Sequence, residues 1–164
     1  MDERLGLAGL AAGQASDVGP SHLPQKVSPG WVDVLATVPL FAGLSRRHLT
    51  KIAGLASSKR YAAGSTLVKS GVPGESVFVI LDGRAIVRAG ARRIPLGAGD
   101  FFGEMSLLDG EPRSATVAAQ TEVLVMMIPR RKFLKLLEKE PRIAIAVMST
   151  LSRRVRALQA AASL

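Results

Sequence analysis

Hydrophobic positions follow a helical spacing in the first ordered part of the chain. In the segment SRRHLTKIAGLAS, the apolar Leu49, Ile52, Ala53 and Ala56 fall on one helical face. Ser45 precedes them and is a residue type that caps helix N-termini. We therefore predict helical structure over residues 31–57, with a break at Pro39.

The spacing changes between Lys59 and Pro129, where short runs rich in Val and Ile alternate with glycine-containing turns. The runs are TLVKSG, SVFVILDG, RAIVRAG, RRIPLGAGD, SATVAAQ and EVLVMMIP. Strands that recur about every 8 to 12 residues are typical of a compact all-β barrel or roll. Residues 58–129 are therefore predicted to form a β-roll.

A helical spacing returns after Pro129. The segment RRKFLKLLEKEP ends at Pro141, which suits the first position of a second helix. We expect two closing helices over residues 130–162, so that the domain spans residues 30–162. Residues 1–29 are rich in Gly, Ala, Ser and Pro and are predicted to be a disordered tail or linker.

The composition of the chain indicates the cellular compartment that suits the protein. The chain has no cysteine, which excludes disulfides and cysteine-ligated metals and fits a reducing compartment. No run approaches the roughly 18 apolar residues that a membrane span needs. The first residues include Asp2 and Glu3, and an acidic start is atypical of a signal peptide. We expect a cytoplasmic protein without a transmembrane segment.

The net charge of +9 is concentrated at the C-terminal end. From Arg130 onward there are nine Lys/Arg and two acidic residues, whereas the first 129 residues hold thirteen Lys/Arg and eleven acidic residues. Such a basic helix is most often a solvated face. The alternative is a protein-interaction or non-specific anion- or nucleic-acid-binding module that uses this helix and needs no small ligand.

The stretch FFGEMSLLDGEPRSATV carries the most specific chemistry. Gly103 permits close approach of the backbone to a ligand, and the free amides of Met105 and Ser106 would form an anion site at a helix start. Arg113 can bind phosphate bidentately. Glu104 would repel phosphate and must meet a donor, such as a sugar hydroxyl. A phosphate beside a ribose satisfies both charges; the alternative is a structural Glu104–Arg113 ion pair.

These residues resemble the phosphate-binding cassette of cyclic nucleotide-binding domains, which occur in catabolite-activator proteins, protein-kinase-A regulatory subunits and cyclic-nucleotide-gated channels. The pattern F-G-E-(L/M)-(A/S)-L followed by P-R-(S/T/A)-A-(T/S)-V is matched at twelve positions, 102–107 and 112–117. The segments VPLFAGLS and GVPGESVFVILDG are also similar to the family. The resemblance covers about residues 31–160.

The resemblance implies a fold of the α+β class that is mainly β. We expect an eight-stranded, antiparallel, jelly-roll-like β-roll with an N-terminal helical segment and two C-terminal helices.

The resemblance also implies a role for each site residue. Glu104 would accept from the ribose 2′-hydroxyl and Arg113 would pair with the cyclic phosphate. The final helix would close over the base, with Arg153 stacking on the purine and Arg154 and Arg156 as rivals. The expected ligand-binding set is Phe102, Gly103, Glu104, Met105, Ser106, Arg113, Ser114, Ala115 and Arg153, with Phe102 at the floor and the amides near Met105, Ser106, Ser114 and Ala115 around the phosphate.

Ser114 bears on the choice of base. In this family a hydroxyl directly after the arginine, most often threonine, is associated with tolerance of cGMP, whereas alanine goes with cAMP. Because serine is intermediate, we expect cAMP to be the main ligand and cGMP a weaker one.

Other function classes fit the residues less well. A metal-dependent β-roll enzyme needs clustered histidines, but residues 59–129 contain none, and there is no catalytic triad or Walker-type lysine. A helix-turn-helix regulator needs some 60 further residues after the long helix, but the sequence ends at Leu164. We therefore expect a non-catalytic, standalone sensor without metal or cofactor, which acts on a protein partner and binds no specific nucleic-acid sequence.

Overall fold

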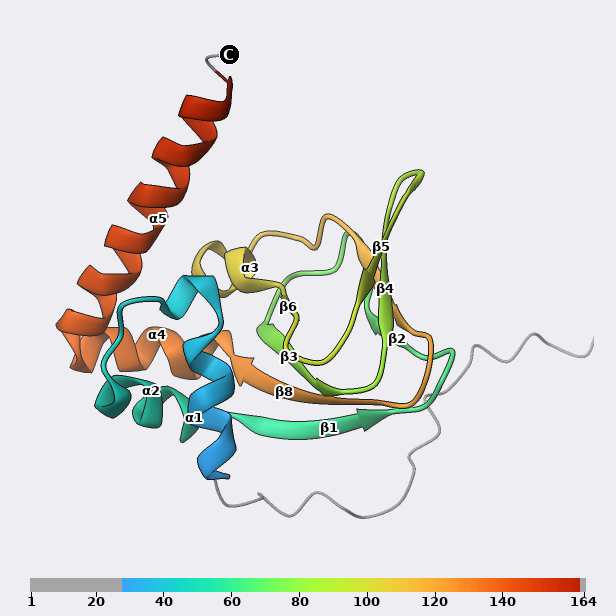
Figure 1. The fold of residues 1–164 in the computed structure, drawn as a ribbon, viewed down its shortest axis with the longest axis horizontal. Helices are drawn as coiled ribbons and strands as arrows, with labels where there is room; N and C mark the ends of the chain where they lie inside the picture. Colours follow the sequence, from blue (N-terminus) through green and yellow to red (C-terminus); the bar gives the residue numbers. More distant parts are fainter. Residues whose placement is uncertain (1–27, 163–164) are drawn as a thin grey trace, which may run out of the picture.

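The computed structural model describes residues 28–162 (Figure 1). The predicted tail therefore lies, apart from its last two residues, outside the described part of the chain. The elements in chain order are α1 (Pro29–Ala36), the 3-10 helix η1 (Pro39–Phe41), α2 (Arg46–Ala53), β1 (Ser57–Tyr61), β2 (Thr66–Val68), β3 (Ser76–Asp82), β4 (Ala85–Ala89), β5 (Arg92–Leu96), β6 (Phe101–Phe102), α3 (Glu104–Asp109), β7 (Thr116–Ala119), β8 (Val123–Pro129), α4 (Arg130–Lys139) and α5 (Pro141–Ala162).

The strands form two four-stranded antiparallel sheets. Sheet A has the order β1-β8-β3-β6, and sheet B has the order β2-β7-β4-β5. The helices α1, α2, α4 and α5 lie toward one end of the roll, whereas the β4–β5 hairpin projects at the other (Figure 1). The expected eight-stranded roll between N-terminal and C-terminal helices is confirmed.

Strand β3 separates the two hydrophobic cores of the molecule. Val77 and Val79 belong to the core shared with the helices, whereas Phe78 and Ile80 point into the inner core between the sheets. Successive side chains of a strand point to opposite faces, so both faces of β3 are buried. This double burial explains why SVFVILD is almost continuously apolar.

The N-terminal helices form within the predicted region, but α2 ends at Ala53, so that Ala56 lies outside the helix and Ser57 already begins β1. The Oγ of Ser45 accepts a hydrogen bond of 3.2 Å from the backbone N–H of His48, which confirms the cap of α2. The apolar face of α2 is buried, with Ile52 fully inaccessible. Helix α1 ends at Ala36 and η1 begins at Pro39, so the predicted break is also confirmed.

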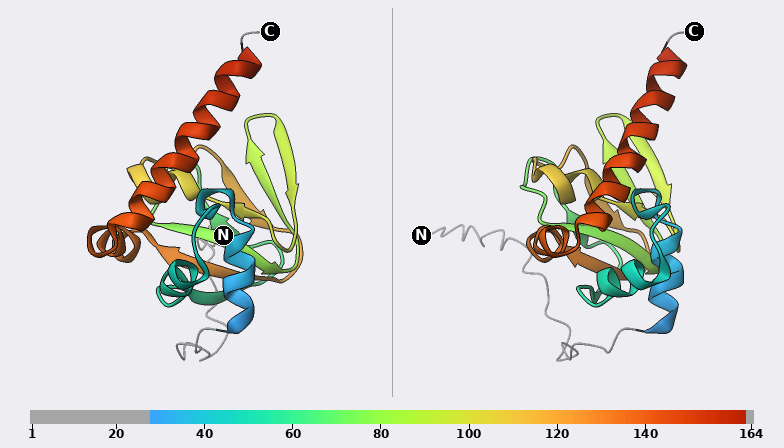
Figure 2. Two further views of the ribbon diagram at one scale, coloured as in Figure 1. Left: turned by 60° about the vertical axis from the view of Figure 1, so that its left-hand side comes forward. Right: turned by 90° about the vertical axis from the view of Figure 1, so that its left-hand side faces the viewer.

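The two closing helices differ in how far they pack. Phe133 of α4 is fully buried and lies against Phe41, with ring centroids 5.8 Å apart. Helix α5 begins at Pro141, as predicted, and its buried residues lie between Ile143 and Thr150. Beyond that point its outer half extends past the rest of the domain (Figure 2). None of the helices within residues 28–162 is long and apolar enough to cross a membrane.

Candidate functional site

The cassette of residues 102–117, which contains the FGEMSL and PRSATV segments, runs from the end of β6 through α3 to the start of β7. Strand β6 ends at Phe102, and the chain turns at Gly103 into the short helix α3. Gly110 ends α3 in a left-handed conformation, and Arg113 follows before β7 begins at Thr116. The first amides of α3 have no partner within the helix, because a helix leaves its first N–H groups unsatisfied.

Gly103 is required by both the backbone and the space around it. Its φ of +82° lies in the left-handed region, which side-chain-bearing residues rarely adopt. A Cβ atom built at this position would also overlap Nη1 of Arg113. Because Gly103 has no side chain, the Arg113 guanidinium can occupy the space beside it.

Arg113 is a buried cation without an anionic partner in the described chain. The residue is only 8% exposed, and its guanidinium donates to the backbone carbonyls of Ser76 and Gly103. Its Cζ lies 5.7 Å from the centroid of the Phe78 ring. None of the ion pairs within residues 28–162 involves it. Burial lowers the pKa of Arg113, as expected of a cation withdrawn from water.

Glu104 pairs with the last helix. Its side chain is 16% exposed, and its Oε1 lies 3.5 Å from Nη2 of Arg154 on α5. The alternative of a structural Glu104–Arg113 pair is therefore wrong for this structure. Glu104 and Arg113, the two charged residues considered for ligand binding, therefore contact different groups: Glu104 contacts Arg154, and Arg113 contacts backbone carbonyls.

The C-terminal arginines are not equivalent. Arg154 contacts the cassette, whereas Nη2 of Arg153 donates to Oγ1 of Thr150 at 3.2 Å and Arg156 is exposed. The assignment of Arg153 to the base stays a prediction. Sequence reasoning had named Arg154 only as a rival, because position on a helix does not show which side chain faces the cassette.

The remaining predicted site residues surround this centre to different degrees. Phe102 is 8% exposed and stacks on Phe78, with ring centroids 4.9 Å apart and an interplanar angle of 6°. Met105 is 50% exposed, Ser114 is exposed and Ala115 is half-buried. Phe102 thus belongs to the inner core, and Phe78 connects it to Arg113.

Ser106 is turned inward and contributes to the internal support of the cassette. Its hydroxyl donates to the carbonyl of Glu111 at 3.3 Å. A Cβ atom added to Gly74 would overlap the Ser106 side chain, so the β2–β3 loop approaches α3 as closely as glycine allows. If Ser106 takes part in binding, only its backbone amide is free to do so.

The β2–β3 loop holds the second half of the cassette. The amide of Gly71 donates to the Arg113 carbonyl, and the amide of Arg113 donates to the Val72 carbonyl, each at 2.8 Å. Pro73 and Pro112 form an isolated bridge beside them. Sequence reasoning noted the glycines only as turns. Their spacing in GVPGES was the available signal for this supporting role.

Arg130 joins the cassette to α4. Its Nη2 donates to the Leu108 carbonyl at 3.1 Å, and its backbone amide donates to the Glu75 carbonyl at 2.8 Å. A Cβ atom at Gly110 would lie 2.9 Å from the Arg130 Cζ. The residue that begins α4 therefore contacts both α3 and the β2–β3 loop.

Comparison with known proteins identifies this arrangement. Residues 58–140 match the model of the cyclic nucleotide-binding domain, a span of 83 residues that includes the whole cassette. The chain belongs to the cyclic nucleotide-binding domain family. The resemblance inferred from the sequence is thereby confirmed, and the family is a regulatory, ligand-binding one.

Individual relatives agree with the family. The domain is 38% identical over 117 residues to a cyclic nucleotide-gated potassium channel of Rhizobium etli, which covers 71% of this chain and 33% of the channel. It is 38% identical over 106 residues to a cAMP-dependent protein kinase regulatory subunit of Aspergillus fumigatus, covering 63% of this chain and 26% of the subunit.

A solved structure supports the fold. The N-terminal domain of a transcriptional regulator from Streptomyces coelicolor A3(2) superposes with a TM-score of 0.72 at 31% identity, covering 79% of this chain and 94% of that chain. In contrast, the chain spans a third or less of the two curated relatives. What the chain shares with those proteins is the cyclic nucleotide-binding domain.

A metal centre finds no basis in the described chain. Within residues 28–162 no group of three or more His, Asp or Glu side chains is placed to hold a metal ion. The chemistry of the site rests on Arg113, Glu104 and the backbone amides of α3.

Proposed function

We propose that this domain is a non-catalytic sensor that binds cAMP, and cGMP more weakly, through residues 102–116. The observation that carries the proposal is the buried Arg113, which lies beside the start of α3 and has no carboxylate partner within residues 28–162. Burying an unpaired charge is costly, so a chain that does so gains when an anion binds there.

The two charges of the cassette assign two parts of the nucleotide. The guanidinium of Arg113 would bind the cyclic phosphate together with the amides of Met105 and Ser106. Glu104 would accept a hydrogen bond from the ribose 2′-hydroxyl. A carboxylate can serve a sugar hydroxyl but not a phosphate, so the pair distinguishes a cyclic nucleotide from an inorganic anion.

Helix α5 would transmit the signal to a protein partner. It reaches the site through Arg154, whose guanidinium contacts the carboxylate that the ribose would use. The ligand and Arg154 would therefore compete for Glu104, and binding would shift the population of α5 positions. The proposed lid role of Arg153 requires its side chain to leave Thr150, a residue of the same helix to which its guanidinium now donates.

The choice of base is proposed to depend on Ser114. Its exposed side chain directly follows Arg113, so its hydroxyl is available to a base. We expect Ser114→Ala to weaken cGMP binding about threefold while cAMP binding changes little, because one neutral hydrogen bond contributes about 0.5–1.5 kcal/mol. Calorimetric titration of both nucleotides measures the ratio.

The test of the proposed function is titration of cAMP and then cGMP into protein that has been unfolded and refolded to remove carried-over nucleotide. We expect saturable binding of about one nucleotide per chain. Arg113→Ala should cost at least about 2 kcal/mol, or about thirtyfold in affinity, because it leaves a buried phosphate charge without its main partner.

Arg47→Ala is the matched control for this titration, since Arg47 is an exposed arginine on α2 outside the site. Folding of each variant is checked by thermal melting. Equal nucleotide affinity for Arg113→Ala and Arg47→Ala would contradict the assignment of Arg113, and no binding by the folded parent protein would contradict the proposed function itself.

A further inference from the structure

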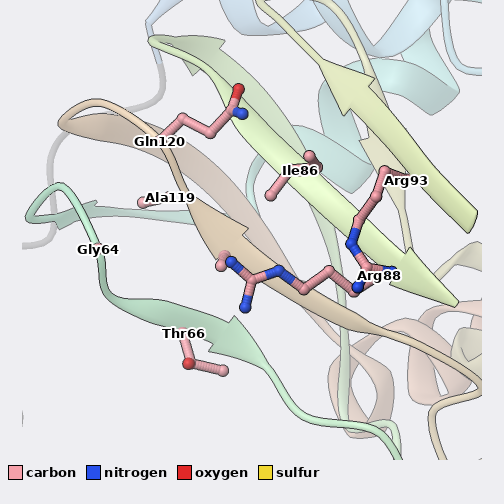
Figure 3. Close-up of a pocket in the computed structure, with 8 residues that line it drawn as sticks. Gly64, Thr66, Ile86, Arg88, Arg93, Ala119 and Gln120 are labelled. Carbon is pink, nitrogen blue, oxygen red and sulfur yellow. The ribbon is translucent and has the colours of Figure 1, made fainter. Parts of the chain in front are cut away.

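The outer face of sheet B holds a hollow that the cassette does not use. Its volume is about 610 Å³, and residues from all four strands of sheet B line it; Figure 3 shows the hollow in close-up. Ala85 and Val87 of β4 pack with the inner core. Because side chains alternate between the two faces of a strand, Ile86 and Arg88 point outward. The lining consists of Gly64, Thr66, Ile86, Arg88, Arg93, Ala118, Ala119 and Gln120.

Two arginines stand opposite each other at this hollow. Arg88 of β4 and Arg93 of β5 are a register pair of the antiparallel hairpin. Directly opposed side chains on one face of such a pair have Cβ atoms about 5 Å apart, and like charges there are destabilising. The arrangement is therefore unfavourable in the isolated chain and becomes favourable when an anion lies between the guanidinium groups.

The surroundings offer these arginines no internal anion. Residues 84–99 contain four arginines and no aspartate or glutamate. Within residues 28–162 no ion pair or side-chain hydrogen bond involves Arg88. Nη1 of Arg93 donates to the carbonyls of Gly90, at 2.7 Å, and Arg92, at 3.0 Å, which fixes its direction.

The floor of the hollow is apolar and contains no aromatic ring. Ile86 is half-buried and Ala118 is 7% exposed, although both belong to the outer face of the sheet. Thr66 and Gln120 supply polar groups at the far side (Figure 3). Single-stranded nucleic acid is usually held on aromatic stacking platforms, which this surface lacks, whereas an aliphatic side chain fits it.

We propose that the outer face of sheet B docks an acidic segment of a partner protein. Carboxylates of that segment pair with Arg88 and Arg93, and an aliphatic side chain between them rests on Ile86 and Ala118. Charge complementarity selects the partner, because the segment must neutralise an arginine pair that has no ion-pair partner within residues 28–162. The proposal does not depend on nucleotide binding.

The test uses the full chain and a short fluorescein-labelled peptide of alternating Glu and Val, with a Gln–Val peptide as the neutral probe. Fluorescence anisotropy at low salt measures binding. We expect the acidic peptide to bind and Arg88→Glu/Arg93→Glu to weaken it at least about tenfold, whereas the Gln–Val peptide does not bind.

Arg47→Glu/Arg142→Glu is the matched control, because it makes the same charge change at exposed arginines of α2 and α5. It should alter peptide affinity less than about twofold. Equal losses in the two double variants would show that net charge alone attracts the peptide and would overturn the proposal. So would tighter binding of a labelled oligothymidylate through Arg88 and Arg93, which would make the surface a nucleic-acid site.

Nucleotide titration of the same variants keeps the two proposals separate. The Arg88→Glu/Arg93→Glu protein should bind cAMP as the parent does, since neither residue belongs to the cassette. Thermal melting of both double variants shows whether each is folded. A folded parent protein that ignores the acidic peptide at low salt would also overturn the docking proposal.

Discussion

Arg113 and Arg88 are both arginines without a carboxylate partner in the described chain, yet their surroundings differ. Arg113 is buried, and its guanidinium donates to two backbone carbonyls. It occupies space that is open only because residue 103 is glycine. Arg88 stands in the open on the outer face of sheet B, opposite a second arginine. A fixed, desolvated charge can select one ligand by shape, whereas an exposed pair selects by charge and tolerates many sequences.

The largest effect that separates the two sites is expected from Gly103→Ala. A Cβ atom there would displace the Arg113 guanidinium and would also strain a backbone with φ of +82°. We expect nucleotide affinity to fall about a hundredfold or more, because the displaced cation loses its charge-assisted contact with phosphate. Calorimetry measures the affinity, and peptide docking on sheet B should not change.

Gly43→Ala is the control that separates the effect of steric overlap with Arg113 from the effect of backbone strain. Gly43 has a φ of +83° and open space around its Cβ position. It should destabilise the fold by about 1 kcal/mol through its backbone without reducing nucleotide affinity. Equal losses of affinity in the two variants would assign the effect to backbone strain and not to Arg113.

Salt should separate the two sites next. Raising sodium chloride from low to about 0.5 M should weaken docking of the Glu–Val peptide at least about tenfold, because exposed charges are screened over a few ångströms at that concentration. Nucleotide affinity should change less than about threefold, since Arg113 is buried. Salt series measured by anisotropy for the peptide and by calorimetry for the nucleotide give the salt dependence of each affinity. Similar salt dependences would contradict the proposed difference between the two sites.

The two neighbouring arginines of α5 should act in opposite directions. Arg153→Ala should weaken nucleotide binding about fivefold if Arg153 stacks on the base, as expected of a cation–π contact. Arg154→Ala should strengthen binding about twofold, because it frees Glu104 from a partly exposed ion pair. Calorimetry distinguishes these results, and a loss of affinity only in Arg154→Ala would transfer the lid role to that residue.

The smallest expected effect is a gain in stability from Arg93→Gln. Removing one of two opposed positive charges relieves their repulsion, and we expect the melting temperature at low salt to rise by about 2 °C. The rise should shrink at high salt. A fall in the melting temperature would mean that the hydrogen bonds of Arg93 to the turn outweigh the repulsion.

The sequence predicted those parts of the fold whose neighbours along the chain determine them. The cap at Ser45, the break at Pro39 and the start of α5 at Pro141 each follow from local chemistry. The pattern of hydrophobic runs did not reveal strand β1, because its sequence SSKRY contains no buried residue. Only its pairing with β8 makes this segment a strand.

The site was predictable in its residue types but less so in its contacts. The cassette motif located Glu104 and Arg113, since each carries a charge that needs a specific partner. The approach of Arg154 to Glu104 joins residues fifty positions apart and depends on the direction in which α5 leaves the domain. The opposition of Arg88 and Arg93 depends on hairpin register, which a list of hydrophobic runs does not determine.

Arg130 has a mechanical consequence for the whole domain. Because it anchors the first turn of α4 to the last turn of α3 and to the β2–β3 loop, these three segments share one attachment point. A displacement of α3 at the cassette must therefore carry the base of α4 with it or break the bond to Leu108. Arg130 therefore couples the position of α3 to the position of α4, and through α4 the cassette is tied to the closing helices at a point that none of the eight strands provides.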